Sequence, residues 1–444
     1  MFGTSGIRGP IGDEITAEVA LQVGRALAST GADEIVVGRD VRESGQMLRR
    51  ALVAGITECG SDVVDVGVEP TPTIARYVGD VDADAGVSIT ASHNPPEDNG
   101  LKLWSASGQA FDTAKRDSIT QTIESAAFEF ADWNDIGRQT TADDAAGRHA
   151  SVLQESLSAA SGSEPAVQEL SVVVDIGNGT GRITADVLAA AGCDVETLNG
   201  QRDGGFPGRP SEPTAENCAS ACELVAATDA DLGLVHDGDA DRLLAIDEDG
   251  QFVGGDALLG LFATQAAGPG DRVAVPVDTS LAVADALAQQ DADVVYTPVG
   301  DVFIAERATD PDVVFGGEPS GAWIWPDETL CPDGPFAACR LGEIVAQGGP
   351  LSTLVADLPQ YPIRRDAIET RAKTAVMERV RDLANEEYAE VRTLDGVRID
   401  TDSGWFLLRA SGTQPLVRLT AEARDGADAD ALFEDAQSLL ERAR

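Results

Sequence analysis

The chain has 444 residues, which is enough for about three or four domains. Hydrophobic residues make up 43% of it, so real cores can form and a chain that is disordered throughout is excluded. The 76 acidic residues outnumber the 32 basic ones and give a formal net charge of -44, which argues against nucleic-acid binding. We found no apolar run of about 18 residues and no signal-peptide pattern, so we expect a cytoplasmic protein without a membrane partner.

The excess of acidic residues has a pattern of its own. Lysine occurs only at Lys102, Lys115 and Lys373, whereas arginine is retained and Asp and Ala are plentiful. A solvated acidic surface of this kind is tolerable in molar salt, where the Debye length falls to about 3 Å. The composition therefore predicts a halophilic source.

The first two-thirds of the chain predict strands that alternate with helices. Such alternation is typical of parallel βαβ units. The expected strands are residues 34–38, 61–67, 84–90, 170–175, 231–235, 243–246, 271–277, 294–297 and 312–315. The expected helices are residues 48–58, 183–191 and 280–289, and residues 140–163 form a helical connector.

The last part of the chain has a different pattern. It predicts helices at 372–387 and 429–442 with short strands at 396–399 and 405–409, which is an α+β module. We therefore expect three related α/β domains and a C-terminal α+β domain. The predicted boundaries are residues 1–148, 149–252, 253–360 and 361–444.

Three carboxylates follow an expected strand at Asp237, Asp239 and Asp241. Hard oxygen ligands at this spacing suit Mg²⁺, and without a cation the three charges would repel one another. A calcium-binding loop is disfavoured, because Arg242 stands where such a loop needs glycine and residues 243–246 predict a strand. A solvated acidic turn is the alternative.

A second polar segment runs from Thr90 to Lys102 and includes Ser92 and His93. Ser92 is a candidate nucleophile or phosphate carrier, and His93 or Lys102 could assist proton transfer. The alternative is an ordinary turn rich in Ser, Asn and Pro.

Three further segments suit anions or sugars. Residues 2–9 combine glycines with Arg8, and residues 316–321 place Glu318 and Ser320 where they could bind sugar hydroxyls. Two arginines, Arg409 and Arg418, flank a Ser-Gly-Thr segment that could envelop a phosphate. The glycine-rich residues 177–181 lack dinucleotide-binding spacing, so a tight turn into a helix is the better interpretation.

Together these motifs resemble the α-D-phosphohexomutase superfamily, which includes phosphoglucomutase/phosphomannomutase and phosphoglucosamine mutase. They occur in the order of the family and span residues 2 to 418. Residues 2–9 and 317–321 are most similar to archaeal members described as phosphoglucosamine mutases. The resemblance implies three related α/β domains and a C-terminal domain around one central cleft.

The resemblance also implies roles for the individual residues. Ser92 would be the phosphorylated serine, and its phosphate would bind Mg²⁺ together with Asp237, Asp239 and Asp241. The other residues of these motifs would assist catalysis or bind the sugar phosphate. The catalytic helpers would be Arg8, His93, Lys102 and Arg242, and the substrate-binding residues would be Gly300, Asp301, Glu318, Ser320, Arg409, Ser411, Gly412, Thr413 and Arg418.

Two positions depart from the family pattern. Gln414 stands where the family commonly has Glu, which changes the local charge and keeps the phosphate cradle. Ala322 stands where several members have His, which leaves the preferred sugar open.

The implied reaction moves a phosphoryl group within a sugar phosphate. Phosphorylated Ser92 would donate to one hydroxyl, the bisphosphate would turn round, and the serine would take back the other phosphoryl group. His93 or Lys102 would be the general base. A mutase for glucose, mannose or pentose phosphates, a Mg²⁺-dependent sugar phosphatase and a sugar-phosphate sensor are the alternatives, and the oligomeric state stays open.

Overall fold

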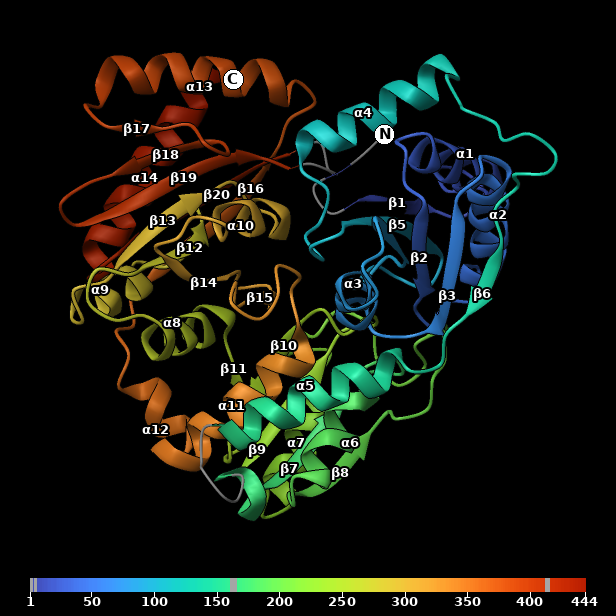
Figure 1. Ribbon diagram of the computed structural model, residues 1–444. Coiled ribbons are helices and arrows are strands. Elements are labelled where there is room, and N and C mark those ends of the chain that lie inside the picture. Colours follow the sequence, from blue (N-terminus) through green and yellow to red (C-terminus); the bar gives the residue numbers. More distant parts are fainter. Residues whose placement is uncertain (1–2, 4–5, 160–165, 412–415) are drawn as a thin grey trace. The chain divides into compact units, whose positions relative to one another are not determined.

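The computed structural model describes residues 3, 6–159, 166–411 and 416–444 (Figure 1). The chain folds into two compact units. Unit 1 comprises Met1–Leu258 and Ser320–Val355, and unit 2 comprises Leu259–Pro319 and Ala356–Arg444.

The first sheet of unit 1 has six strands in the order β1-β5-β4-β2-β3-β6. Strands β2, β3, β4 and β6 are parallel, whereas β5 is antiparallel to both β4 and β1. The bounds are β1 Ile7–Pro10, β2 Glu34–Arg39, β3 Asp62–Val68, β4 Ala85–Ile89, β5 Asp98–Ser105 and β6 Gln139–Thr141.

Helices cover both faces of this sheet because its strands are apolar on both sides. The helices α1, α2 and α4 share one buried cluster, and α3 and the start of α5 share the other. Their bounds are α1 Ala17–Ala28, α2 Gly45–Glu58, α3 Thr71–Asp80, α4 Thr113–Ser125 and α5 Ala145–Ala159. Gly24 lets α1 approach α2 closely, since a Cβ there would lie 2.4 Å from the Leu52 carbonyl oxygen.

The second sheet of unit 1 has the order β11-β10-β9-β7-β8, with β7, β8 and β9 parallel and β10 and β11 antiparallel. Its strands are β7 Ser171–Asp175, β8 Asp194–Leu198, β9 Leu232–His236, β10 Leu243–Ile246 and β11 Phe252–Val253. Unit 1 also contains η1 Ala166–Glu169, α6 Arg182–Ala190, α7 Ala219–Ala227, β15 Trp323–Ile324 and α11 Gly334–Gly348, and α12 Leu351–Ala356 follows.

A buried ionic cluster positions α11 against α3 and α5. Asp333 caps α11 by accepting from Phe336 N at 3.0 Å, and its other oxygen accepts from Arg76 Nε at 2.7 Å. His149 Nε2 lies 3.1 Å from the same oxygen, and Thr73 Oγ1 lies 2.8 Å from His149 Nδ1. The cluster therefore joins three helices from distant parts of the sequence.

Unit 2 combines a parallel and an antiparallel sheet. In the first, β12 Arg272–Pro276 lies between β13 Asp293–Thr297 and β14 Val313–Gly317. The second has the order β16-β20-β19-β18-β17 and is antiparallel throughout. The other bounds are α8 Gly255–Ala266, α9 Leu281–Ala288, α10 Asp301–Arg307, β16 Ile363–Glu369, α13 Lys373–Glu387, β17 Val391–Arg392, β18 Val397–Asp400, β19 Gly404–Ala410, β20 Leu416–Ala423 and α14 Gly426–Ala443.

The two sheets of unit 2 pack on each other around Arg398, whose side chain is buried. Its guanidinium carbon lies 4.2 Å from the Trp405 ring centroid and 4.6 Å from that of Tyr296. A second connection is Glu422, which accepts from Ser280 Oγ at 2.5 Å. These contacts fix the C-terminal sheet relative to β12–β14.

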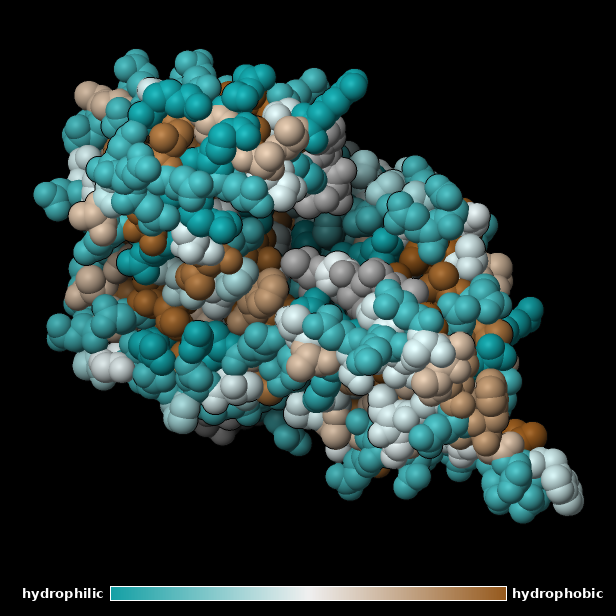
Figure 2. All heavy atoms as spheres, turned by 90° about the horizontal axis from the view of Figure 1, so that it is seen from above, coloured by the Kyte–Doolittle hydropathy of each residue, from teal (hydrophilic) through white to brown (hydrophobic). Residues whose placement is uncertain are grey.

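The surface agrees with the acidic composition. Figure 2 shows hydrophilic residues over much of the visible face, with smaller hydrophobic areas between them. Among the described residues, no helix combines the length and the apolar character needed to cross a membrane.

The predicted fold class is confirmed, but several strands were not predicted: β1, β5 and β6 of the first sheet, β8 of the second, and β16 and β20 of the C-terminal sheet among them. The α/β units and the C-terminal α+β module are present, and residues 177–181 do turn into a helix. Strand β5 was not predicted, because its polar residues Asp98, Asn99 and Lys102 hide the strand pattern. The four domain boundaries and the central cleft stay predictions.

Candidate functional site

Ser92 lies in the loop that follows β4, at the carboxyl end of that strand. Its side chain is buried, and its Oγ donates to Asp237 Oδ2 at 2.6 Å and lies 3.4 Å from Asp241 Oδ1. His93 Nδ1 lies 3.5 Å from the same hydroxyl oxygen. The serine and the acidic loop, 145 residues apart in sequence, therefore form one site.

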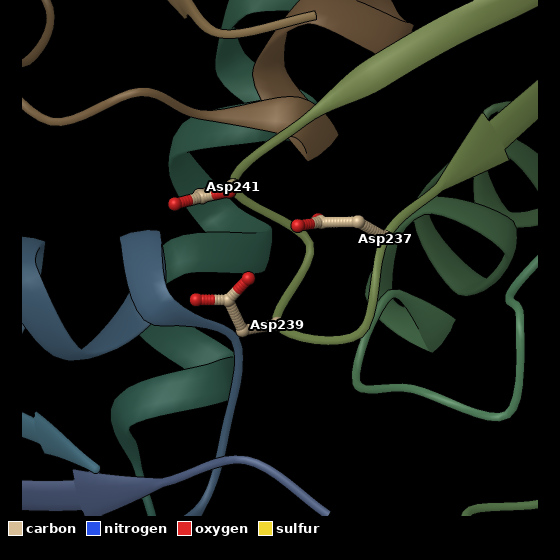
Figure 3. Close-up of side chains that lie close together, drawn as sticks. All are labelled: Asp237, Asp239 and Asp241. Carbon is tan, nitrogen blue, oxygen red and sulfur yellow. The ribbon is translucent and has the colours of Figure 1, made fainter. Parts of the chain in front are cut away.

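Asp237, Asp239 and Asp241 occupy the turn between β9 and β10 (Figure 3). All three are buried, and each offers a ligand atom within 4.8 Å of the others. Asp239 Oδ1 is buried without a hydrogen-bond partner among the described residues. An unsatisfied buried carboxylate oxygen is costly, and a divalent cation would satisfy it.

The surroundings shift the pKa values of Asp237 and Asp239 in opposite directions. Burial raises the pKa of Asp237 well above its usual range, and the charges of Asp239 and Asp241 raise it further. Burial also opposes ionisation of Asp239, but Lys102, Thr71 and Arg8 outweigh it and hold that pKa below its usual range. One carboxylate thus resists ionisation while its neighbour stays charged.

Lys102 comes from β5 and its side chain is buried beside the acidic loop. Its Nζ lies 3.1 Å from Asp239 Oδ2 and also forms an ion pair with Asp241 Oδ2. The ammonium neutralises part of the carboxylate charge in this structure. Strand β5 is the reason that Lys102 reaches the acidic turn.

Arg8 and Arg242 complete the charged surroundings. Arg8 lies on β1 opposite Gly100 of β5, and its buried Nε has no hydrogen-bond partner among the described residues. The backbone N of Arg242 lies 3.3 Å from Asp237 Oδ1. Burial lowers the pKa of His93 to about 2, and the charges of Arg242 and Arg8 contribute to that shift.

Sequence reasoning missed Thr71, which begins α3 at the carboxyl end of β3. Its Oγ1 donates to Asp239 Oδ2 at 2.7 Å, and its backbone N donates to Asp239 O at 2.9 Å. The signal was available, because carboxyl ends of neighbouring parallel strands meet at one edge of a sheet. Hydroxyl residues just after an expected strand therefore belong among the candidates.

In unit 2, the predicted substrate residues fall into two linked groups. Gly300 precedes α10, of which Asp301 is the first residue, and Gly300 N donates to Glu318 Oε1 at 2.6 Å. Asp395, missed from the sequence, accepts from Val299 N at 3.3 Å and from Arg409 Nη1 at 2.9 Å. Ser320 is half-buried and belongs to unit 1.

Arg409 and Arg418 are direct cross-strand partners on β19 and β20. Like charges at opposite positions of an antiparallel pair are destabilising, and a bound anion would relieve this repulsion. Ser411 is buried, and its backbone N donates to Leu416 O at 2.9 Å. Gly412, Thr413 and Gln414 lie outside the described residues.

Comparisons with known proteins cover almost the whole chain. Residues 1–130, 152–250 and 254–361 match the family models for α/β/α domains I, II and III of phosphoglucomutase/phosphomannomutase. Residues 367–438 match the model of the C-terminal domain of the same proteins.

Individual relatives agree with these family matches. "Probable phosphoglucosamine mutase" of Methanopyrus kandleri is 42% identical over 99% of this chain and 98% of its own length. A protein of the same name from Methanosarcina barkeri is also 42% identical, over 100% of this chain and 99% of its own. A crystal structure of a phosphoglucomutase/phosphomannomutase family protein from Burkholderia thailandensis aligns with a TM-score of 0.87 at 29% identity, covering 100% of this chain and 98% of that one.

Proposed function

Because the chain belongs to the phosphoglucomutase/phosphomannomutase family, we propose that it is a mutase that moves a phosphoryl group between two hydroxyls of a sugar phosphate through Ser92. The observation that carries this proposal is the 2.6 Å hydrogen bond from Ser92 Oγ to Asp237 Oδ2. It places the Ser92 hydroxyl beside two of the three buried carboxylates, Asp237 and Asp241. A phosphate on that hydroxyl would lie where a cation can shield it.

Glucosamine phosphate is the substrate we propose. Two relatives that match nearly the whole chain carry the name "Probable phosphoglucosamine mutase". The reaction would interconvert the 6-phosphate and the 1-phosphate through a bisphosphate. The alternative hypothesis is a mutase for another sugar phosphate, since Ala322 departs from the family pattern.

We propose that Mg²⁺ binds at Asp237, Asp239 and Asp241 together with a phosphate on Ser92. The unpartnered Asp239 Oδ1 and the spacing of the ligand atoms support this assignment. Oxygen ligands alone are typical of Mg²⁺ sites. The cation would supply charge neutralisation for the transferring phosphoryl group.

The chain's own residues supply alignment and further charge. Arg8, Lys102 and Arg242 would stabilise the transferring phosphoryl group, and Lys102 would exchange one of its carboxylate partners for a phosphate oxygen. His93 and Lys102 are the candidates for the base that takes the proton of the attacking hydroxyl. His93 Nδ1 lies 3.5 Å from Ser92 Oγ.

The remaining predicted residues would bind the rest of the substrate. Gly300, Asp301, Glu318 and Ser320 would contact the sugar hydroxyls. Arg409, Ser411, Gly412, Thr413 and Arg418 would bind the phosphate that is not being transferred. The opposed Arg409 and Arg418 support an anion at this place.

The cysteines and the net charge suggest the compartment and the salt conditions in which the protein works. All six cysteines are free of disulfides, which supports a reducing compartment, and we propose the cytoplasm. The net charge of -44 supports a halophilic source.

The test is an assay of mutase turnover in high salt with Mg²⁺. Glucosamine, glucose and mannose 6-phosphates and a pentose 5-phosphate are supplied, and the corresponding 1-phosphates and free phosphate are measured. We expect the fastest turnover with glucosamine 6-phosphate and a transient bisphosphate. Release of inorganic phosphate without a 1-phosphate would identify a phosphatase instead.

The role of Ser92 is tested by Ser92→Ala, which removes the phosphate acceptor. We expect turnover to fall by at least about 10⁴-fold, since no other group can carry the phosphoryl group. Ser61→Ala is the matched control, because Ser61 is also buried in the first sheet but donates to Ala32 O at 2.6 Å, away from the aspartates. Full turnover in Ser92→Ala would overturn the assignment.

A further inference from the structure

The backbone of Ser92 is in an unusual conformation. Its φ is 51°, in the left-handed region that non-glycine residues rarely adopt. Such a conformation costs free energy and persists only where the surrounding contacts impose it. The contacts around the loop should therefore show what holds Ser92 in place.

A single buried side chain, Arg42, provides most of those contacts. Its Nη2 donates to Ser92 O at 2.8 Å and to Asn94 O at 2.6 Å. Its Nη1 donates to Asp98 O at 2.9 Å and to Pro95 O. Three carbonyl groups of the loop between β4 and β5, and that of Asp98 at the start of β5, thus converge on one guanidinium.

Asp40 and Phe206 orient that guanidinium. Arg42 Nε donates to Asp40 Oδ2 at 3.1 Å, so all five N–H groups of the guanidinium have acceptors. Thr90 Oγ1 donates to Asp40 Oδ2 at 2.8 Å and accepts from Ser92 N at 2.8 Å. The Phe206 ring centroid lies 5.0 Å from the Arg42 guanidinium carbon.

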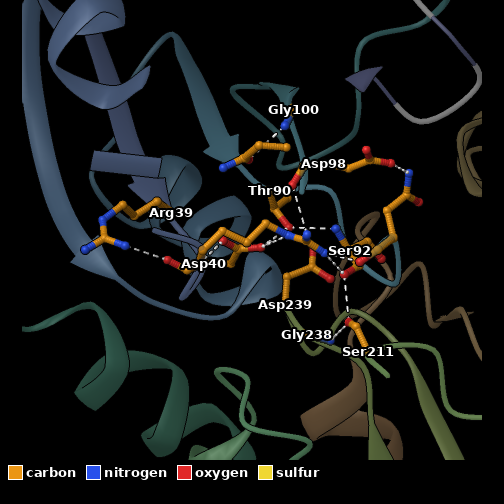
Figure 4. Close-up of polar contacts among 12 residues, drawn as sticks. Arg39, Asp40, Thr90, Ser92, Asp98, Gly100, Ser211, Gly238 and Asp239 are labelled. Atoms are coloured by element: carbon orange, nitrogen blue, oxygen red, sulfur yellow. Dashed lines mark hydrogen bonds and ion pairs between the residues drawn. The ribbon is translucent and has the colours of Figure 1, made fainter. Parts of the chain in front are cut away.

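Ser211 extends this network to the acidic turn (Figure 4). Its Oγ donates to Ser92 O at 2.9 Å and accepts from Gly238 N at 3.0 Å. One hydroxyl group therefore joins the backbone of the serine to the backbone between Asp237 and Asp239. Figure 4 shows Ser211 and Gly238 on the side of Ser92 opposite to Thr90.

We propose that Arg42 is a positioning residue for phosphoryl transfer, and that Ser211 sets the distance between the serine loop and the acidic turn. The inference rests on the proposed function of Ser92. The five hydrogen bonds of the Arg42 guanidinium go to backbone carbonyls around the serine and to Asp40, so Arg42 would act by holding Ser92 Oγ toward the aspartates. A small displacement of a reacting atom can lower a rate by about 100-fold.

Arg76 offers a matched comparison within the same unit. It is also an arginine paired with an aspartate, Asp333, with a side chain that is 10% exposed, and its guanidinium carbon lies 5.7 Å from the ring centroid of Phe336. Its Nη1 donates to Glu328 O at 3.1 Å, away from the Ser92 loop. A purely structural role for Arg42 would make the two arginines equivalent in their effect on turnover.

The experiment compares Arg42→Lys with Arg76→Lys in the full chain. Lysine keeps the charge but has three donors in place of the planar set of five. Both variants should lower the melting temperature. For Arg42→Lys we expect kcat per folded molecule to fall about 10- to 100-fold with KM within about threefold of wild type, whereas Arg76→Lys should keep kcat within about twofold.

The second readout is the ³¹P resonance of Ser92 after phosphorylation with glucose 1,6-bisphosphate. We expect it to shift or broaden in Arg42→Lys and to be unchanged in Arg76→Lys, because only the former loosens the serine loop. If Arg42→Lys does not fold, Ser211→Ala is measured in the same way, with Ser61→Ala as its control. Its expected result is a lower kcat with an unchanged KM.

The outcomes separate the two proposals. A wild-type protein without mutase turnover overturns the proposed function and this inference with it. If the wild type has turnover but Arg42→Lys matches Arg76→Lys in kcat and in the ³¹P resonance, the inference alone is overturned. Where Arg42→Lys does not fold, the same conclusion follows from a Ser211→Ala variant that matches Ser61→Ala in both measurements.

Discussion

At the scale of single residues, the candidate site is a balance between carboxylates and a lysine. Lys102 Nζ pairs with both Asp239 and Asp241, although the chain has only three lysines. Three buried carboxylates are strongly unfavourable without positive charge beside them, and the Lys102 ammonium supplies part of that charge. Lys102 and a divalent cation should therefore compete for the same oxygens.

Lys102→Met tests this competition. In EDTA we expect the free energy of unfolding to fall by about 3–5 kcal/mol, because two buried carboxylates lose their cation. Added Mg²⁺ should then raise the melting temperature more than it does in wild type, because binding is linked to folding. Calorimetry with EDTA and with Mg²⁺ measures both effects.

The control is Lys115→Met. The ammonium of Lys115 is exposed and donates to Ser105 Oγ at 2.8 Å, away from the acidic turn. This variant should show the wild-type response to Mg²⁺. A Lys102→Met variant with no more response to Mg²⁺ than wild type would contradict the idea that Lys102 and the cation share ligands.

At the scale of elements, the glycine-rich turn before α6 supports the acidic turn after β9. The turn that leads from β7 into α6 packs against the acidic turn after β9, and Thr180 N donates to Gly238 O at 3.1 Å. A Cβ on Gly179 would lie 2.5 Å from Gly238 O, closer than side-chain carbons approach a carbonyl. Residues 177–181 thus pack closely against the acidic turn. This close packing explains why they are rich in glycine, and no dinucleotide-binding role is needed.

Gly179→Ala should displace the acidic turn. We expect a loss of about 1–3 kcal/mol in stability from overpacking, together with a weaker apparent affinity for Mg²⁺. Thermal unfolding and a Mg²⁺ titration of mutase turnover measure these effects.

The matched control is Gly147→Ala in α5, where a Cβ would meet nothing within 4 Å. There alanine should be neutral or stabilise by about 0.5–1 kcal/mol, because glycine is a poor helix former. Wild-type stability and Mg²⁺ affinity in Gly179→Ala would show that the two turns can separate freely.

At the scale of the whole molecule, charge dominates. A formal net charge of -44 on 444 residues creates repulsion that the ion pairs on the surface offset only in part. Salt shortens the range of this repulsion, whereas it scarcely affects the buried pairs. The folded state should therefore need salt.

We expect the melting temperature to rise steadily between about 0.1 M and about 3 M KCl, as screening removes the repulsion. Circular dichroism at each salt concentration measures it. Sucrose is the control, because it favours compact states without screening charge and should stabilise less. A melting temperature independent of KCl would argue against a halophilic protein.

Much of this molecule could be predicted from local patterns. The parallel strands other than β6 and β8, the acidic turn and the turn before α6 were predicted at nearly their observed positions, because hydrophobic periodicity and glycine are local signals. Strand β5 was missed because three polar residues, among them Lys102, interrupt its apolar pattern.

By itself, the sequence determined the fold class, the acidic character and the chemical groups available: a serine, three aspartates and a set of arginines. Only the tertiary structure decided which of them meet. Ser92 and Asp237 come from two different sheets, and Thr71, Arg42 and Ser211 join them through contacts between distant segments. Such contacts depend on how strands and loops pack in space, and no local pattern of residues encodes that packing.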